Sequence, residues 1–390
     1  MSTHSLELAD IFRVHGPAYK KQHRLPRNQL RVLNAIERCR TASLGGHVDR
    51  CNDCGHERIS YNSCRNRHCP KCGSLAKEKW LQARQRELLP VPYFHIVFTL
   101  PDELNTITLY NKRQMYTMLF HAAAETLICL SRDPKHLGGE IGLIGVLHTW
   151  GQNLMNHPHL HCIVPGGALS FDGQRWIGSR KNFFIPVHVL SQVFRGKFLA
   201  SLKSAYRKKE LQLEGALESL RSRTVFQGII NTLYAKGWVV YAKQPFGGPE
   251  QVLGYLGRYT HRVALTNNRL VSMSDGKVSF RWRDYRDGKK EKLMTIDASE
   301  FIRRFLLHVL PEGLCKIRYY GFLSNRHRLD QLLKCQEMLG VQPTNEKADA
   351  KSWQDVLLEV TGVDIRICPH CHKGRMQRCR ILEPAQNAPP

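Results

Sequence analysis

The sequence predicts an α+β protein in which a small metal-binding module precedes a larger domain of helices and strands. Three observations predict this class. Residues 45–73 are rich in Cys, His, Arg and Asn and have too few aliphatic side chains to build an ordinary core. From residue 93 onward, short apolar runs typical of strands alternate with helical periodicity. Between 262 and 296, turn signals such as Asp275-Gly276 predict an antiparallel meander.

Composition favours a nucleic acid as the partner. The 390 residues include 58 Lys and Arg against 33 Asp and Glu, which gives a net charge of +25. An excess of this size repels itself unless it meets a polyanion, and nucleic acid is the commonest one. Without a run of about 18 apolar residues, the sequence predicts no membrane-spanning helix. The first ten residues also lack the pattern of a signal peptide.

Cysteine usage indicates the compartment. Thirteen cysteines are an odd number and are unevenly spread, which argues against the disulfide framework of a secreted protein. We therefore expect metal thiolates in a reducing cytoplasm.

Three regions follow one another along the chain. Residues 1–90 form a helical lead-in, expected as two helices within 6–40, then the cysteine-rich module and a polar helix over 76–89. Residues 91–325 form the central domain, and residues 326–390 a helical tail with a small Cys/His cluster. The expected elements of the central domain are strands at 93–100, 141–150, 160–165, 237–243 and 315–322, helices at 104–130, 188–220, from 250 and at 301–309, and the meander at 262–296.

The amino-terminal module carries two C-x-x-C pairs, Cys51-Asn-Asp-Cys54 and Cys69-Pro-Lys-Cys72. Each pair can clamp a metal from a tight turn, and two pairs together complete a tetrahedral zinc site. Cys64 and His68 are further candidate ligands, so the module could hold one zinc or two. A closed site of four ligands is structural, because it leaves no coordination position open for chemistry. Arg65 and Arg67 would then face the DNA.

A second group of candidate ligands lies near the carboxyl terminus, where Cys368-Pro-His-Cys371 is followed by His372 and Cys379. It is either a second zinc knuckle or an accessory set of ligands, and the sequence assigns it no function.

Residues 156–161, Asn-His-Pro-His-Leu-His, are the densest cluster of imidazoles. On a strand, residues two apart share a face, so His159 and His161 point the same way while Leu160 points toward the core. Two converging imidazoles predict a divalent-metal site that needs a third ligand. Gln152 is the first candidate for this ligand, followed by His148 and His157.

The segment 254–262 places Tyr255 and Tyr259 four residues apart, on one face if the segment is helical. Arg258 and Arg262 would put positive charge beside the phenols. A tyrosine hydroxyl has a reference pKa near 10 and is a weak nucleophile, so attack on phosphorus needs help from cations and a metal. The alternative is that both rings are ordinary core aromatics.

These three motifs in this order resemble the HUH rolling-circle transposases of bacterial insertion sequences, and more narrowly the two-tyrosine group typified by insertion sequence ninety-one. The resemblance rests on residues 51–72, 147–167 and 255–262, with 301–311 and 317–322 similar to later segments of that family. It covers about residues 25 to 325.

The resemblance implies a fold and a mechanism. The fold would be a five-stranded antiparallel sheet flanked by helices, with the strand at 93–100 first and the histidine pair on a central strand. Mg²⁺ or Mn²⁺ on His159, His161 and a third ligand would polarise a phosphodiester of single-stranded DNA, from element ends and target. One tyrosine would form a 5′-phosphotyrosine, the second would permit another cut, and zinc would be structural.

Other readings remain at this stage. A replication initiator or relaxase would use the same chemistry, although the fused zinc module and the lack of a GxxxxGK[ST] helicase motif favour a transposase. A non-catalytic zinc protein that binds DNA would explain the charge but neither the histidines nor the tyrosines. A metallohydrolase of small substrates is disfavoured by the charge. The sequence leaves open whether the chain acts as a monomer or a homo-oligomer.

Overall fold

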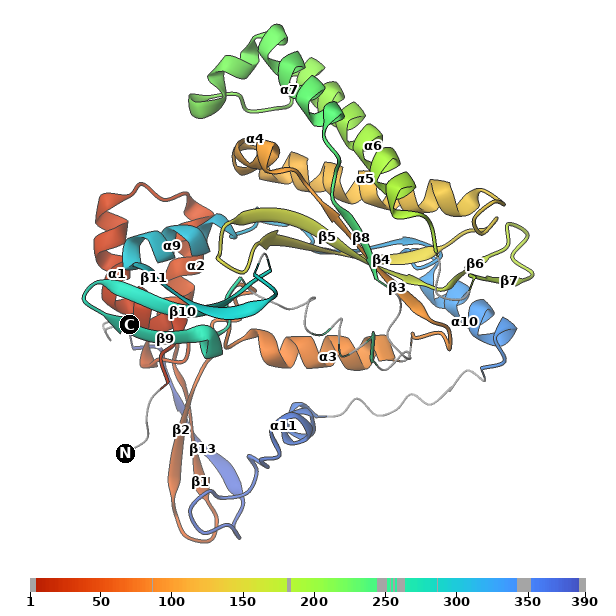
Figure 1. Cartoon of the computed structure of the whole chain (residues 1–390). Helices are drawn as coiled ribbons and strands as arrows, with labels where there is room; N and C mark the ends of the chain where they lie inside the picture. The colour runs from red at the N-terminus through yellow and green to blue at the C-terminus, as the bar shows by residue number, and fades with distance from the viewer. Residues whose placement is uncertain are drawn as a thin grey trace.

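The computed structural model describes residues 5–85, 87–180, 184–243, 251, 252, 254, 257, 264–285, 287–341 and 352–385. A five-stranded sheet lies at the centre, with helices above and below it, and a narrow three-stranded sheet projects from one side (Figure 1). In the part of the chain that is described, no helix has both the length and the apolar character needed to cross a membrane.

The two predicted amino-terminal helices are confirmed as α1 (Leu8–Gln22) and α2 (Arg27–Glu37). Their apolar sides share one core with α9 (Ala298–Leu307) and with the strands β9 (Leu270–Ser274) and β10 (Lys277–Asp284). Phe12 of α1 meets Phe305 of α9 edge to face, with ring centroids 5.4 Å apart. The lead-in is thus packed against the carboxyl-terminal half of the central domain.

The projecting sheet joins the two ends of the chain. Its order is β13-β1-β2, with β1 (Gly46–Cys51) in the middle, β2 (Glu57–Tyr61) on one side and β13 (Met376–Leu382) on the other. Both pairings are antiparallel. The sequence predicted no strand in the tail, because the run 376–382 contains Gln and two Arg without a regular alternation and pairs only with residues more than 300 positions earlier.

The central sheet has the order β12-β4-β5-β3-β8, and every neighbouring pair is antiparallel. Its strands are β3 (Tyr93–Thr99), β4 (Gly142–Trp150), β5 (Asn156–Pro165), β8 (Val240–Lys243) and β12 (Ile317–Gly321). The predicted five-stranded antiparallel sheet is confirmed, and the strand that carries His159 and His161 is the central one.

The two faces of this sheet have different covers. Leu147 and Leu160 point into a large core with α5 (Lys112–Arg132) and α6 (Val187–Arg207), which lie above the sheet in Figure 1. Val146 and Ile163 point to the other face, which α3 (Gly73–Gln85) covers from below. Because side chains alternate along each strand, consecutive residues pack into two separate cores, one on each face of the sheet.

Several boundaries differ from the sequence prediction. The helix expected at 104–130 is divided into η2 (Asp102–Leu104), α4 (Asn105–Tyr110) and α5, and the long basic helix expected at 188–220 ends at Arg207. Lys209 follows with a positive φ of 57°, which ends the helix, and η3 (Gly215–Arg221) and α7 (Arg223–Ala235) come next. The remaining elements are η1 (Ala42–Leu44), β6 (Gly167–Leu169), β7 (Trp176–Gly178), η4 (Asn267–Arg269), β11 (Lys290–Asp297), α10 (Arg328–Met338) and α11 (Trp353–Thr361).

Gly321 is the last residue of β12, an edge strand of the central sheet. We predict that Gly321→Ala destabilises the protein. The residue has a φ of +61°, and an added Cβ would overlap the carbonyl oxygen of Ile141. Gly313 also has a positive φ, of +71°, but a Cβ there would meet no atom within 4 Å. In both variants an alanine must adopt a positive φ, which costs about 1 kcal/mol. The free energy of unfolding, measured in denaturant, should fall by about 2 kcal/mol more in Gly321→Ala than in Gly313→Ala. Equal losses in the two variants would contradict this account.

Candidate functional site

The pairing of β4 with β5 brings three histidines together. In this register His148 lies opposite His159, Val146 opposite His161 and Leu147 opposite Leu160. Because side chains alternate, the leucines enter the core and the histidines share the opposite face. One ring nitrogen from each of His148, His159 and His161 lies within 4.8 Å of the others. Three converging imidazoles can bind a divalent metal ion.

Hydrogen bonds set the tautomer of one of these rings. Nδ1 of His159 lies 2.7 Å from the backbone carbonyl oxygen of His157. A carbonyl oxygen only accepts, so Nδ1 carries the proton and the lone pair is on Nε2. A hydrogen bond of this kind, from a ligand histidine to a carbonyl, orients the ring toward a metal.

A fourth histidine, which sequence reasoning missed, supports the group from β3. Nε2 of His95 lies 2.8 Å from Nδ1 of His161, and both residues are buried. Burial lowers the pKa of His95 to about 3, with smaller contributions from Lys243 and His159, so this ring is neutral at pH 7. Coordination through Nε2 of His161 would require a proton on Nδ1, and His161 would then donate to His95. The only signal in the sequence was a single histidine within an apolar strand.

Gln152, the first candidate for the third ligand, is not on the strands that carry the histidines. It lies in the turn 151–155 that joins β4 to β5, and its backbone carbonyl accepts a hydrogen bond from Arg269 at 2.5 Å. His148, ranked second, lies beside His159 and His161, because strand register decides which side chains converge.

The predicted nucleophiles Tyr255 and Tyr259 lie outside the described residues, as do Arg258 and Arg262. Two described residues of the same segment, Val252 and Gly257, show which part of the fold lies beside it. Val252 is helical and buried, and it shares a core with Val146 and Ile163 on the histidine face of the sheet. Gly257 is also helical and lies against α3, where an added Cβ would be 2.6 Å from Leu81.

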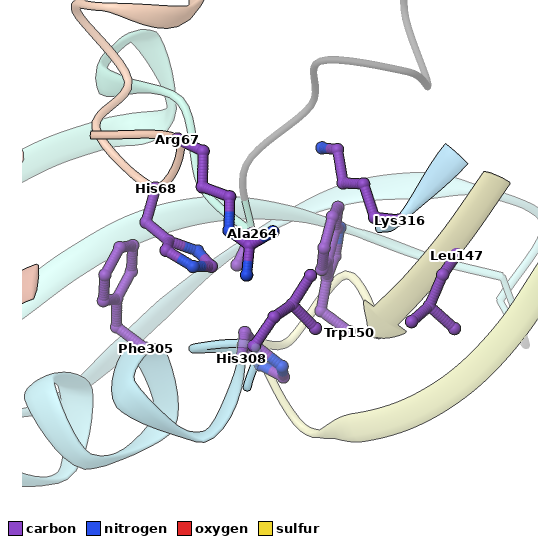
Figure 2. Close-up of a pocket in the computed structure, with 9 residues that line it drawn as sticks. Arg67, His68, Leu147, Trp150, Ala264, Phe305, His308 and Lys316 are labelled. Atoms are coloured by element: carbon purple, nitrogen blue, oxygen red, sulfur yellow. The ribbon is translucent and has the colours of Figure 1, made fainter. Parts of the chain in front are cut away.

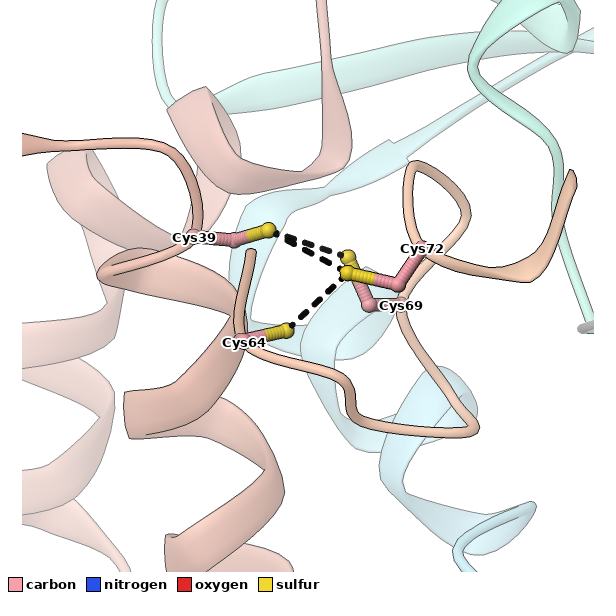
Figure 3. Close-up of side chains that lie close together, drawn as sticks. All are labelled: Cys39, Cys64, Cys69 and Cys72. Carbon is pink, nitrogen blue, oxygen red and sulfur yellow. Dashed lines mark hydrogen bonds between the residues drawn. The ribbon is translucent and has the colours of Figure 1, made fainter. Parts of the chain in front are cut away.

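A cluster of four cysteines, Cys39, Cys64, Cys69 and Cys72, lies at the base of the amino-terminal module (Figure 3). Sγ of Cys72 is 3.5 Å from Sγ of Cys39 and of Cys64, and Sγ of Cys69 is 3.7 Å from that of Cys39. Tetrahedral zinc with bonds of about 2.3 Å to sulfur separates its ligands by about 3.8 Å, so the cluster fits zinc. Cys39 was not predicted, because it is a lone cysteine just after α2, and only the fold brings it to the others.

The structure corrects the predicted grouping of the two C-x-x-C pairs. Cys51 and Cys54 do not join Cys69 and Cys72. They lie at the far end of the β1–β2 hairpin, beside Cys368 and Cys371. The extended hairpin separates the two pairs, which a count of residues between motifs does not register.

His68 is not a member of either cysteine cluster. Its ring projects into a small pocket beside Phe305, His308 and Trp150 (Figure 2). Desolvation by burial, with the nearby Arg67 adding to it, lowers the pKa of His68 to about 3.

The two arginines predicted to face DNA have different surroundings. Arg67 donates hydrogen bonds to the carbonyl oxygens of Leu314 at 2.7 Å and Pro311 at 3.0 Å, so its guanidinium fastens the module to the central domain. Arg65 is exposed and has a positive φ of 51°.

Comparison with known proteins places these features in a family. A family model described as "Transposase zinc-binding domain", of the IS91 type, matches residues 11–100, and one described as "Putative transposase" matches residues 142–330. The chain is 53% identical over 386 residues to "Putative transposase y4qJ" of Sinorhizobium fredii, covering 98% of this chain and 97% of the relative. The chain belongs to the IS91 family of transposases.

A more distant relative agrees. The transposase for insertion sequence element IS801 of Pseudomonas savastanoi pv. phaseolicola is 29% identical over 305 residues, which cover 76% of this chain and 71% of the relative. No solved structure matches this chain. As an IS91-family transposase, the protein acts on DNA and carries a zinc-binding domain, and the comparisons favour this function over a replication initiator or a regulator without catalytic activity.

We predict that His148, and not Gln152, is the third metal ligand. His148→Ala should weaken Mn²⁺ binding by about tenfold or more, since even losing a hydrogen-bond partner of a ligand costs about 10- to 100-fold. Gln152→Ala is the matched control and should bind Mn²⁺ as the wild type does. Isothermal titration of each folded variant measures the difference. Weaker binding in Gln152→Ala alone would restore the original assignment.

A second prediction separates Cys39 from His68 as a zinc ligand. Cys39→Ser should lose one equivalent of zinc relative to the wild type, because it removes one of four converging thiolates. His68→Ala should keep the full zinc content, since its ring lies in the pocket of Figure 2. Elemental analysis of the purified proteins measures the zinc content of each variant. Zinc loss in His68→Ala alone would contradict the assignment of Cys39 as the ligand.

Proposed function

We propose that this transposase is a metal-dependent HUH enzyme that cuts and rejoins single-stranded DNA through 5′-phosphotyrosine intermediates. The observation that carries the proposal is the convergence of His148, His159 and His161 on one face of the central strands. The described neighbours of the tyrosine motif, Val252 and Gly257, lie on that same face or against the helix that covers it.

The three histidines would hold the Mg²⁺ or Mn²⁺ ion that the HUH resemblance implies, with water and phosphate oxygens as its other ligands. His159 and His161 each have Nδ1 engaged in a hydrogen bond, which directs Nε2 toward the common centre. When bound, the ion would supply Lewis-acid polarisation of a phosphodiester oxygen. His95 holds the ring of His161 in place through the 2.8 Å contact of its Nε2 with Nδ1 of His161.

The tyrosines would carry out the covalent step. The Oη of Tyr255 or Tyr259 attacks phosphorus and loses its proton, a bond forms between this oxygen and phosphorus, and the bond from phosphorus to the 3′-oxygen breaks. The leaving 3′-oxygen takes up a proton and becomes a 3′-hydroxyl. Arg258 and Arg262, on the same segment, would offset the charge that builds on the phosphate.

The covalent link keeps the free energy of the phosphodiester bond, so attack by a 3′-hydroxyl can rejoin strands without ATP. Two tyrosines would let the enzyme cut a second time before it releases the first end, which suits transfer of one strand from donor to target. The substrates would be single-stranded DNA of the element ends and of the target, in the bacterial cytoplasm. The charge of +25 supports a polyanionic substrate.

A covalent-adduct gel tests the proposal. The protein is incubated with end-labelled single-stranded oligonucleotides from the DNA that flanks its own gene, with and without Mg²⁺. We expect a metal-dependent adduct on the new 5′ end that the cut creates, partial loss of it in Tyr255→Phe and Tyr259→Phe, and complete loss in the double variant.

Tyr241→Phe is the matched control, because Tyr241 is 52% exposed on β8 and has no role in the proposal. It should form as much adduct as the wild type. An adduct that persists in the double variant would assign the nucleophile elsewhere. Tight, salt-sensitive binding of the oligonucleotide without any covalent adduct would contradict the proposed catalytic mechanism.

A further inference from the structure

Four cysteines from the two ends of the chain meet beyond the module's first cluster. Cys51 and Cys54 lie where β1 ends and the chain turns into β2, and Cys368 and Cys371 precede β13. Sγ of Cys51 is 3.7 Å from Sγ of Cys371, and Sγ of Cys54 is 3.7 Å from Sγ of Cys368. All four sulfurs lie within 4.8 Å of one another.

These separations fit a metal ion and not disulfides. A tetrahedral zinc thiolate site separates its sulfurs by about 3.8 Å, whereas a disulfide bond is about 2.05 Å long. All four cysteines are free thiols in the structure. Apolar packing is also a poor explanation for the nearness of the four sulfurs, because Cys54 is exposed and Cys371 is partly exposed. Three of the four intervening residues, Asn52, Asp53 and His370, are polar.

The two turns that present the sulfurs are built alike. Each has the form C-x-x-C, and each is followed by a residue with positive φ, 72° at Gly55 and 58° at His372. The amide of Asp53 points at Sγ of Cys51 at 3.4 Å, and that of His370 at Sγ of Cys368 at the same distance. Backbone N–H groups aimed at sulfur favour the thiolate, which is the form that binds zinc.

Contacts around the sulfurs hold the two turns against each other. Asn52 donates its backbone N–H to the carbonyl of Arg375 at 3.1 Å, and its side-chain oxygen accepts the N–H of Arg375 at 2.8 Å. The rings of His56 and His370 stack with centroids 5.3 Å apart. Gly374 lies so close that an added Cβ would be 2.6 Å from Cβ of Asp53 and would overlap Sγ of Cys51. The site is thus a formed interface and not a chance approach of two loops.

We propose that Cys51, Cys54, Cys368 and Cys371 bind a second structural zinc ion, which joins the carboxyl-terminal segment to the amino-terminal zinc module. Four thiolates close the coordination sphere, so this ion takes no part in DNA cleavage. Because Cys54 and Cys368 are 314 residues apart, the ion cross-links the ends of the chain and restricts the unfolded state. The pairing of β13 with β1 continues the same junction along the module.

Zinc content gives the first test. The wild type should hold two equivalents of zinc, and the double variant Cys368→Ser, Cys371→Ser should hold one. The matched control is Cys129→Ser, Cys315→Ser, which removes two exposed cysteines outside both clusters and should leave two equivalents. Two equivalents in the Cys368, Cys371 double variant, or only one in the wild type, would overturn the proposal.

A second test uses the wild-type protein and does not depend on any variant folding. Cys54, Cys129 and Cys315 are all exposed, so accessibility alone predicts that an alkylating reagent modifies them at similar rates. A zinc-bound thiolate is shielded, and mass spectrometry should find Cys54 modified at least about tenfold more slowly than Cys129, until a chelator removes the metal. Equal rates before chelation would refute the second zinc site.

Discussion

The alternation of side chains along β4 and β5 is the constraint on which the rest of the site depends. One residue of each pair of neighbours must face the core beneath α5 and α6, and the other must face away. Leu147 and Leu160 are fully buried in that core, so His148, His159 and His161 are held on the opposite face. A shift of register by one residue would place the imidazoles among the leucines of that core, where they would lose their polar partners, and burial of unpaired polar groups opposes this.

Hydrogen bonds to the sheet also orient two of the histidine rings. His159 is oriented by the carbonyl of His157 on its own strand, and His161 by His95 from the neighbouring strand β3. The rings are therefore held by hydrogen bonds to the sheet itself. A site built on paired strands keeps its geometry better than one built on loops. The face that carries the histidines is covered by α3, whereas the opposite face packs against α5 and α6.

The positions of the cysteine clusters do not depend on the core of the central sheet. A module of short, polar strands buries little apolar surface, and metal–thiolate bonds can supply the stability that its small core lacks. Cys39 comes from the helical lead-in, while Cys368 and Cys371 come from the tail. The module is consequently assembled from three separate parts of the chain, and its neighbour α9 ties it to the central domain through the core around Phe12 and Phe305.

The sequence by itself determined the features that depend on local order: the amphipathic lead-in helices, the strands of the central sheet, the side of β5 on which His159 and His161 lie, and the cysteine pairs with the spacing of metal ligands. Only the tertiary structure decided which distant residues complete each set. Strand register brings His148 opposite His159, which the order of residues along the chain does not reveal. The fold of the chain also brings Cys39 beside Cys69, and Cys368 beside Cys54. Periodicity records which side chains share a face, whereas proximity across strands and chain ends depends on packing that no local pattern contains.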